Sequence, residues 1–278
     1  MLPLVFIDVD GTLVGPAGAP STAVWGAAAA AVGRGQHLAL ATARPAFGAT
    51  WGWARRLDPD GWHLFQSGTS LVHTGTGQVR HTTLPEPAVE RLAATAAERG
   101  WVLELYADRD LVVDSDAPLA RAHADLLGIA HRRRGRDDLD GPVVRAQLVV
   151  PVAAAAAARA VAPEGTVAHS ATSPAMPEAA FVSVTAAGTT KASGVAALAA
   201  VAGVDLAEVA MVGDGNNDAE ALAVVGHGIA MGNAEPEARE AAAHRVGPVD
   251  ADGLVEALAL TARLAGPAGP AGAGPPGS

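Results

Sequence analysis

The stretch that decides the fold is Leu4-Val5-Phe6-Ile7, followed directly by Asp8-Val9-Asp10-Gly11-Thr12. Four consecutive apolar residues predict a buried strand, and the two aspartates come where that strand ends. A carboxylate cluster in that place is costly unless something cationic neutralises it. Side chains two apart in extended chain point to the same side, so Asp8 and Asp10 can address one substrate, one as nucleophile and the other as proton donor and acceptor.

The two residues that follow fit this interpretation. Gly11 lets the chain turn sharply away, and Thr12 can satisfy exposed amide groups. The alternative is an ordinary polar turn, since Asp-Gly is common where a strand meets a loop. An Asp-x-Asp-Gly-Thr sequence straight after an amino-terminal apolar strand is more specific than such a turn, and it favours the functional interpretation.

A second motif has the same construction far along the chain. Val209–Val212 predicts another buried strand, and Gly213-Asp214-Gly215-Asn216-Asn217-Asp218 follows it. Mg²⁺ binds one or two protein carboxylates together with waters and phosphate oxygens, and Asp8 with Asp214 would supply these. Asn217 and Asp218 open the next helix, where amide groups can face an anion. An Asn- and Asp-rich helix cap is the alternative.

Two weaker elements complete the set. Thr42 ends the second predicted strand, where its hydroxyl group and the following amides could hold a phosphoryl oxygen. Lys191 is the only lysine among the 19 basic residues and lies in the first turn of a predicted helix. A cation there is mildly unfavourable against the helix dipole, which argues for a function, although an exposed solubilising lysine is the alternative.

Short apolar strands alternate with Ala- and Leu-rich helices, which is the pattern of an α/β sheet covered by helices. We expect strands at residues 4–9, 37–41, 63–66, 71–74, 78–81, 101–107, 111–114, 143–150, 166–170, 181–185, 209–212 and 228–231. We expect helices at 22–32, 47–57, 87–99, 119–127, 152–161 and 191–202, from about 217, and near 253–264. The simplest account is one discontinuous α/β core, 1–79 plus 185–265, with an α+β domain inserted at 80–184 and a disordered Gly/Pro/Ala tail at 266–278.

Composition narrows the function. The net charge of −10 argues against a nucleic-acid-binding protein with a broad basic face. The absence of cysteine excludes disulfides, thiolate metal sites and cysteine nucleophiles. No stretch is apolar enough for a membrane span, and the amino terminus has no signal-type pattern. We expect a soluble, cytoplasmic protein, a monomer or homodimer, whose partner is a small molecule.

The four elements, in this order, resemble the haloacid dehalogenase (HAD) superfamily of phosphohydrolases, and in particular its Cof-type, sugar-phosphatase-like subfamily. The resemblance spans nearly the whole chain to about residue 264. It implies a doubly wound, mainly parallel Rossmann-like core with an inserted α+β cap domain at 80–184. It also implies a Mg²⁺-dependent phosphatase of small phosphate esters, with sugar phosphates as the expected substrates.

Carried onto this sequence, the resemblance implies a role for each motif. Asp8 would be the nucleophile that becomes an aspartyl-phosphate, and Asp10 the general acid and base. The implied metal ligands are Asp8, Asp214 and the carbonyl group of Asp10. The implied phosphate- and substrate-binding residues are Thr42, Ala43, Arg44, Lys191 and Asn217, and the supporting residues are Gly11, Thr12 and Asp218, the last orienting Lys191 or the metal waters.

The chain departs from the family pattern in two places. Thr42-Ala43-Arg44 stands where the family has Thr-Gly-Arg, which keeps the threonine and the arginine. Ser67-Gly68-Thr69 stands where Asn-Gly-Ala is frequent, so the contact that this asparagine makes is lost.

Substrate choice would lie with the inserted segment. Its polar residues Glu104, Tyr106, Asp108, Asp114 and Asp116 could bind sugar hydroxyls, although solvated strand edges are the favoured interpretation for each. The Arg132–Arg136 cluster could hold a second anionic group, but the acids that follow it favour a self-compensated surface loop. Trp51 and Trp53 indicate packing or a dimer contact. A phosphomutase or phosphotransferase on the same fold, or a non-catalytic ligand-binding regulator, are the alternative functions.

Overall fold

The computed structural model describes residues 1–173 and 175–264, and the predicted tail at 266–278 lies outside them. The chain divides into two compact units. The first contains Met1–Leu40 and the chain from Val195 onward, and the second contains Ala41–Gly194. This division falls at residues 40–41 and 194–195, whereas the predicted domain boundaries are at 79–80 and 184–185, and those boundaries stay a prediction.

The first unit is built on a five-stranded sheet in the order β13-β12-β11-β1-β2, with every neighbouring pair parallel. The strands are β1 (Leu4–Ile7), β2 (His37–Leu40), β11 (Val209–Gly213), β12 (His227–Ala230) and β13 (His244–Arg245). β1 and β11 are fully buried, as their unbroken apolar sequences predict. Because the sheet is parallel, the carboxyl ends of β1, β11 and β12 share one edge.

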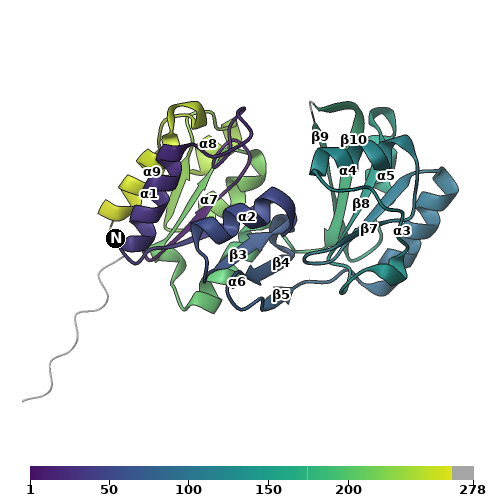
Figure 1. Ribbon diagram of the computed structural model, residues 1–278, viewed down its shortest axis with the longest axis horizontal. Coiled ribbons are helices and arrows are strands. Elements are labelled where there is room, and N and C mark those ends of the chain that lie inside the picture. The colour runs from purple at the N-terminus through teal and green to yellow at the C-terminus, as the bar shows by residue number, and fades with distance from the viewer. Residues whose placement is uncertain (174, 265–278) are drawn as a thin grey trace, which may run out of the picture. The chain divides into compact units, whose positions relative to one another are not determined.

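Helices link these strands and cover the sheet. They are α1 (Thr22–Gly33), α7 (Ala219–Val224), α8 (Pro236–Ala241) and α9 (Gly253–Arg263), and α6 (Lys191–Ala202) begins in the second unit and ends in the first. α1 and α9 lie side by side against the sheet (Figure 1). Ser21 caps α1, its hydroxyl accepting a hydrogen bond from the Val24 amide at 3.1 Å. This arrangement confirms the predicted α/β class.

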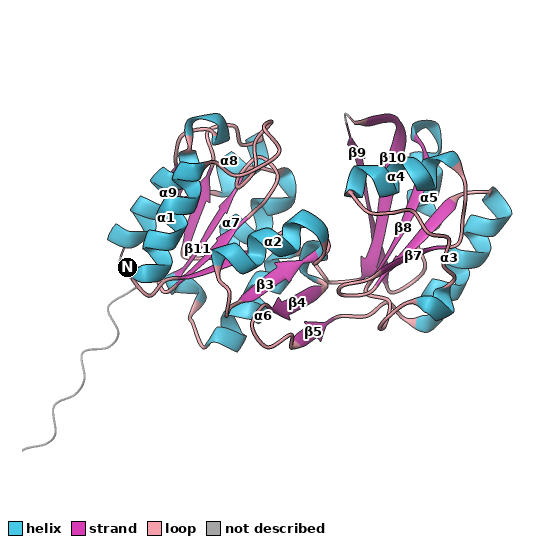
Figure 2. Ribbon diagram, in the orientation of Figure 1, coloured by secondary structure: helices cyan, strands magenta, loops and turns pink. Residues whose placement is uncertain are grey.

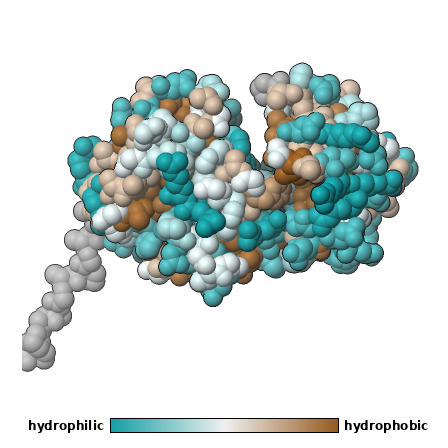
Figure 3. Space-filling model, in the orientation of Figure 1, coloured by the Kyte–Doolittle hydropathy of each residue, from teal (hydrophilic) through white to brown (hydrophobic). Residues whose placement is uncertain are grey.

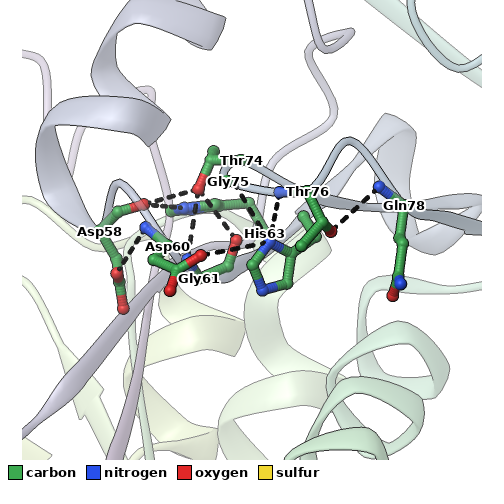
Figure 4. Close-up of polar contacts among 9 residues, drawn as sticks. Asp58, Asp60, Gly61, His63, Thr74, Gly75, Thr76 and Gln78 are labelled. Carbon is green, nitrogen blue, oxygen red and sulfur yellow. Dashed lines mark hydrogen bonds and ion pairs between the residues drawn. The ribbon is translucent and has the colours of Figure 1, made fainter.

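The second unit begins with a small antiparallel sheet in the order β3-β4-β5. The elements here are α2 (Gly48–Leu57), β3 (Trp62–Phe65), β4 (Ser70–His73) and β5 (Val79–His81). Figure 4 shows the polar contacts that fix the turns at one end of it. Thr74 Oγ1 lies 2.8 Å from the Asp58 carbonyl oxygen and accepts from the Gly61 amide at 3.2 Å, so one hydroxyl group joins two loops.

A second, five-stranded antiparallel sheet follows, in the order β7-β6-β8-β10-β9. Figure 2 shows its strands in magenta beside the helices in cyan. The strands are β6 (Val102–Tyr106), β7 (Leu111–Val113), β8 (Arg145–Pro151), β9 (Thr166–Ser173) and β10 (Met176–Ala186), and the helices are α3 (Glu86–Arg99), α4 (Pro118–Leu127) and α5 (Ala155–Ala160). It is the α+β sheet that the inserted segment predicts.

Side chains alternate between the two faces of this antiparallel sheet, and each face carries a buried apolar layer. Leu105, Leu148 and Val182 pack with α3 and α5 on one face. Their sequence neighbours Val149 and Phe181 pack with α4 on the other. Both faces of the antiparallel sheet are therefore at least partly covered, and the α4 face also carries buried polar groups.

Several predicted bounds were wrong. β10 begins at Met176 and not at 181. It pairs with all of β9, which continues beyond the predicted end at 170 to Ser173. The predicted helix at 152–161 is a 3₁₀ turn followed by α5. α8 and β13 were not predicted, because both are short. Within the described part of the chain, no helix is long and apolar enough to cross a membrane.

Candidate active site

Asp8 is placed by the central strand of the first unit. β1 pairs with β2 on one side and β11 on the other, and the Asp8 amide continues the ladder by donating to the Val212 carbonyl oxygen at 2.9 Å. The side chain is only 6% exposed. Asp8 is therefore a buried carboxylic acid held on a rigid strand end.

Asp10 does not share this environment. β1 ends at Ile7, and the Leu13 amide donates to the Asp8 carbonyl oxygen at 3.2 Å, so residues 8–14 form a turn and not extended chain. Asp10 is exposed while Asp8 is buried. The premise that Asp8 and Asp10 alternate along an extended strand was wrong, because the strand stops before both residues. Their proposed division of labour stays a prediction.

The second motif brings Asp214 against the first. Asp214 follows β11 directly, and its Oδ1 accepts a hydrogen bond from the Thr12 hydroxyl at 2.9 Å. Gly11 has φ +82°, and a Cβ there would lie 2.0 Å from Asp214 Oδ2. Gly11 is therefore needed twice, for its left-handed backbone and for the space that Asp214 occupies. Gly11 and Thr12, which were predicted to have supporting roles, therefore join the first motif to Asp214 of the second.

Asp218 anchors the loop that carries Asp214. Its side chain is fully buried, and its Oδ2 accepts hydrogen bonds from the amides of Asp214 at 3.1 Å and Gly215 at 3.0 Å. Asp218 belongs to a 3₁₀ turn, Asn216–Asp218, that leads into α7. Asn217, predicted to contact substrate, is exposed in the same turn. Asp218 thus shapes the loop as well as adding a carboxylate to it.

Three of these acids form a group that could hold a metal ion. Asp8, Asp214 and Asp218 each offer a carboxylate oxygen, and these oxygens lie within 4.8 Å of one another. Like charges held so close together in a partly buried site repel, and a hard cation relieves that repulsion. The donor set, all carboxylate oxygen, is the kind that Mg²⁺ prefers. The residues present therefore fit a divalent cation, and Asp218, which was predicted to have a supporting role, supplies the third carboxylate.

Sequence reasoning missed Asn233. Its Nδ2 donates to Asp214 Oδ2 at 3.0 Å and to the Gly11 carbonyl oxygen at 2.9 Å, and its Oδ1 accepts from the Val249 amide at 2.9 Å. Asn233 follows β12, the next strand of the parallel sheet, at the edge where Asp8 and Asp214 lie. A polar residue just after a third predicted strand was the available signal.

Glu235 supports the same loop. Its carboxylate accepts from the Asn216 amide at 2.7 Å, and its amide donates to the Asp214 carbonyl oxygen at 2.8 Å. Glu235 is therefore a second residue after β12 that fixes the Asp214 segment.

Thr42, Ala43 and Arg44 belong to the second unit, where they form a tight turn. Thr42 is buried, and its Oγ1 accepts from the Arg44 amide at 3.0 Å. The Thr42 amide donates to the Leu64 carbonyl oxygen at 3.1 Å. The Arg44 guanidinium lies 5.4 Å from the centre of the Trp53 ring. The predicted phosphate-binding segment is thus fixed within its own unit.

Lys191 is not an exposed solubilising residue, since its side chain is 3% exposed. It is the first residue of α6. Thr190 and Ser193 cap this helix reciprocally, with the Thr190 amide donating to Ser193 Oγ at 2.9 Å and the Ser193 amide to Thr190 Oγ1 at 3.2 Å. Lys191 is therefore a buried lysine at the start of a capped helix, and its role stays a prediction.

The departure from the family pattern lies at a strained turn between these elements. Gln66, Ser67 and Gly68 have φ values of +52°, +58° and +101°. A Cβ on Gly68 would lie 2.2 Å from the Thr190 carbonyl oxygen, and the Ser67 amide donates to the Thr42 carbonyl oxygen at 2.9 Å. Asparagine adopts positive φ more readily than serine, which gives a backbone reason for the asparagine of the pattern.

The polar residues of the inserted sheet were predicted to be solvated strand edges. For three of them this was wrong: Glu104, Tyr106 and Asp108 are buried. Asp114 and Asp116 are exposed, as expected. The difference arises because α4 covers the sheet face that carries Glu104.

Glu104 is at the centre of a buried hydrogen-bond network. Its carboxylate lies 2.7 Å from His123 Nδ1, and it accepts from the Tyr106 hydroxyl at 2.8 Å and from Gln147 Nε2 at 3.0 Å. Ser183 Oγ donates to Gln147 Oε1 at 3.0 Å and extends the row onto β10. Burial and the neighbouring Glu104 raise the pKa of Tyr106 well above its usual value, so the phenol stays protonated.

Arg145 lies beside this network. Its guanidinium is 3.9 Å from the centre of the Tyr106 ring and donates to the Ala43 carbonyl oxygen at 3.2 Å, while its Nε is buried without a hydrogen-bond partner. Burial lowers its pKa from the usual value. Arg145 thus ties β8 to the Thr42-Ala43-Arg44 turn within the second unit.

Three arginines of the cluster are paired with acids, although not with the acids that follow the cluster in the sequence. Arg133 pairs with Asp114 at 2.7 Å, and Arg136 pairs with Glu86. Arg134 bonds both carboxylate oxygens of Asp110 at 2.8 Å. Burial acts to raise the pKa of Asp110, but the hydrogen bonds from Arg134 and from the backbone outweigh it and lower that pKa below its usual value.

Comparisons with known proteins agree with this construction. Residues 167–258 match the family model of the haloacid dehalogenase-like hydrolases. An uncharacterized protein from the pdhA 5′ region of Geobacillus stearothermophilus is 40% identical over 72 residues, which are 26% of this chain and 76% of that protein.

Solved structures extend the likeness over both units. A haloacid dehalogenase-like hydrolase from Bacteroides thetaiotaomicron superposes with a TM-score of 0.82 at 24% identity, covering 94% of this chain and 99% of that one. The HAD subclass IIB sugar phosphatase BT4131 superposes with a TM-score of 0.75 at 22% identity, covering 93% and 98%. At these identities the superpositions show the fold. With the family model, the Geobacillus relative and the paired aspartate loops, they make this chain a member of the haloacid dehalogenase-like hydrolase family.

Proposed function

We propose that this protein is a Mg²⁺-dependent phosphatase that hydrolyses small phosphorylated metabolites, sugar phosphates in particular, through an aspartyl-phosphate on Asp8. The observation that carries the proposal is the carboxylate group at one sheet edge, where Asp8, Asp214 and Asp218 lie within 4.8 Å. Such a group suits a site that receives a cation and a phosphate together. The sugar phosphatase BT4131, a structure of the same fold, supports the substrate class.

The chemistry assigned to the chain's own residues balances in two steps. A carboxylate oxygen of Asp8 attacks phosphorus, the bond from phosphorus to the ester oxygen breaks, and Asp10 donates a proton to the departing alcohol. Asp10 then takes a proton from water, the water oxygen attacks phosphorus, and the bond to Asp8 breaks to release inorganic phosphate. The burial of Asp8 on a strand end and the exposure of Asp10 suit a fixed nucleophile and a proton donor in contact with solvent.

The metal would be held by Asp8, Asp214 and the carbonyl group of Asp10, with Asp218 close enough to ligate or to orient a metal-bound water. Bound there, Mg²⁺ would supply positive charge against the phosphoryl oxygens. Thr12 and Asn233 keep the Asp214 carboxylate in one orientation through their hydrogen bonds. We assign Thr42, Ala43, Arg44, Lys191 and Asn217 to the phosphoryl group and the substrate.

The experiment is a phosphate-release screen over sugar phosphates, nucleotides and phosphoglycerates, with Mg²⁺ and with EDTA. We expect turnover of at least one sugar phosphate in Mg²⁺, and loss of that turnover in EDTA and in Asp8→Asn. The matched control is Asp125→Asn, the same change at an exposed aspartate of α4, which should retain full activity.

Three results would count against the proposal. Turnover that survives Asp8→Asn would contradict the covalent step. Release that requires a second sugar as acceptor would indicate a phosphotransferase or mutase. An absence of turnover on every ester, with the wild-type chain folded, would favour a ligand-binding regulator.

A further inference from the structure

A cavity of about 240 Å³ lies within the second unit, on the α4 side of the antiparallel sheet. Its apolar walls come from β7, α4 and the segment after α4, through Leu111, Val113, Ala120, Ala124 and Ile129. Figure 3 shows apolar surface in brown next to polar surface in teal over the part of this unit that carries α4. Ligand pockets in proteins start at about 300 Å³, so an occupant of this cavity would be small.

Two arginines on the cavity wall have no acidic partner. Arg109 and Arg132 line the cavity, and neither has a carboxylate oxygen of the described residues within 4.0 Å. Arg109 is held with its guanidinium 4.2 Å from the centre of the Trp51 ring, which fixes its position.

The neighbouring arginines show the contrast. Arg133 and Arg136, in the same loop as Arg132, pair with Asp114 and Glu86, and neither lines the cavity. Arg134 also lines the cavity, but it is paired with Asp110, which lies on the same wall, so Arg109 and Arg132 are the two cavity arginines without an acidic partner among the described residues.

One ring nitrogen of a histidine on this wall also lacks a hydrogen-bond partner. His131 lines the cavity, its Nε2 lies 3.3 Å from Asp116 Oδ1, and its Nδ1 is buried without a hydrogen-bond partner. A buried polar atom left unsatisfied costs about 1–3 kcal/mol, so such atoms are normally satisfied by water or a ligand. Nδ1 can accept from a hydroxyl group when the ring is neutral, or donate to an anion when the ring is protonated.

We propose that this cavity binds a small organic acid. Its carboxylate or phosphonate-like end would lie on Arg109 and Arg132, its apolar body would pack against Leu111, Val113 and Ile129, and a polar atom of it would satisfy His131 Nδ1. None of these residues belongs to the proposed catalytic or metal site. The inference therefore stands apart from the proposed phosphatase activity, and either can fail without the other.

The test is direct binding to the full-length protein in EDTA, measured by isothermal titration calorimetry. The probes are benzoate and phenylphosphonate, whose carbon–phosphorus bond is not hydrolysed, with benzyl alcohol as the neutral analogue. We expect both anions to bind at one saturable site and benzyl alcohol to bind at least tenfold more weakly. The double variant Arg109→Gln/Arg132→Gln should weaken anion binding at least tenfold.

The matched control is Arg133→Gln/Arg136→Gln, which removes the same charge from the same region without changing the cavity wall. It should bind benzoate within twofold of the wild type. Ala130→Trp supplies an independent variant, because Ala130 is exposed on the cavity rim and the indole would fill the space while leaving both cations. It too should lose benzoate binding, with an unchanged far-UV spectrum.

Four results would overturn the proposal: no binding of either anion, equal binding of benzyl alcohol, wild-type affinity in the Arg109/Arg132 variant, or an equal loss in the control variant. The last would show that benzoate responds only to net charge.

Discussion

The two units bury acidic side chains in opposite ways. In the first unit, Asp8, Asp214 and Asp218 gather three like charges within 4.8 Å. In the second, Glu104 stands as one acid among three partners, His123, Tyr106 and Gln147. The first site is partly buried and groups three acids, whereas the second is buried and surrounds one acid with hydrogen-bonding partners.

The two sites illustrate two reasons for burying a polar group, which are to specify packing and to bind a ligand. The Glu104 network is saturated with hydrogen bonds, so it specifies the packing of α4 on the sheet. In the first unit, Thr12 and Asn233 donate hydrogen bonds to Asp214, which lies close to two further acids, an arrangement that suits the binding of a cation. Burial alone therefore does not identify a functional acid, and the grouping of three acids is the feature that distinguishes the first unit.

The largest effect should come from breaking the saturated network. Glu104→Ala leaves the hydrogen-bonding groups of His123, Tyr106 and Gln147 buried without their acceptor, and should lower the free energy of unfolding by about 3–5 kcal/mol. Urea denaturation measures this. The control Glu90→Ala, on the exposed face of α3, should change it by less than about 0.5 kcal/mol. Equal effects would mean that the network is not structural.

The second prediction concerns a buried histidine of the second unit. Burial lowers the pKa of His63 from 6.5 to about 4. Because the folded-state pKa lies below the unfolded one, the unfolded chain binds the proton first, and stability present above pH 6.5 is lost as the pH falls towards 4. The loss should be about 3 kcal/mol.

Urea titrations between pH 7.5 and 4 measure this loss. A variant, His63→Gln, should show a flatter pH dependence over that window, although carboxylates contribute to both proteins. Parallel curves for the two proteins would contradict the assigned pKa.

The third prediction tests the first unit through a residue that does not need to touch the metal. Asn233→Ala removes a donor to Asp214 and to the Gly11 carbonyl group, and should weaken Mg²⁺ binding about 10- to 100-fold. Calorimetric titration with MgCl₂ measures this. Asn216→Ala, in the neighbouring exposed turn, should stay within about twofold of the wild type. An unchanged affinity for Mg²⁺ in Asn233→Ala would contradict the supporting role assigned to Asn233.

The smallest effect is a gain. Ser67 has φ +58°, which asparagine tolerates better, so Ser67→Asn should raise the free energy of unfolding by roughly 0.5–1 kcal/mol. Ser170→Asn, in the exposed part of β9, should bring no gain, because asparagine is disfavoured in strands. A loss of stability in Ser67→Asn would show that the serine makes a contact that matters more than its backbone conformation.

The sequence predicted best those strands and helices whose own residues give a strong local pattern. β1 and β11 were predicted because they are unbroken apolar runs, and α6 was predicted with its observed bounds because caps and a glycine limit it. β10 was predicted too short, since its first half alternates with polar and small residues and gains its structure from pairing with β8 and β9.

The site residues were likewise predicted only where the local sequence pattern is strong. Asp8 and Asp214 were found because each follows a buried strand. Asn233 was not, because its position after a predicted strand is a weak signal until the parallel sheet brings the end of β12 beside the end of β11. Glu104 was assigned to solvent, since nothing local in β6 reveals that α4 covers it.

By itself, the sequence determined the α/β class, the family and the two aspartate loops, because these depend on residues that are neighbours in the chain. Only the tertiary structure decided which polar groups are buried and which partners they have. It set Asp218 beside Asp8, Asn233 on Asp214, Glu104 among three donors, and Arg109 and Arg132 on a cavity. The physical reason is that hydrogen bonding and charge compensation act over a few ångströms in space, whatever the separation along the chain.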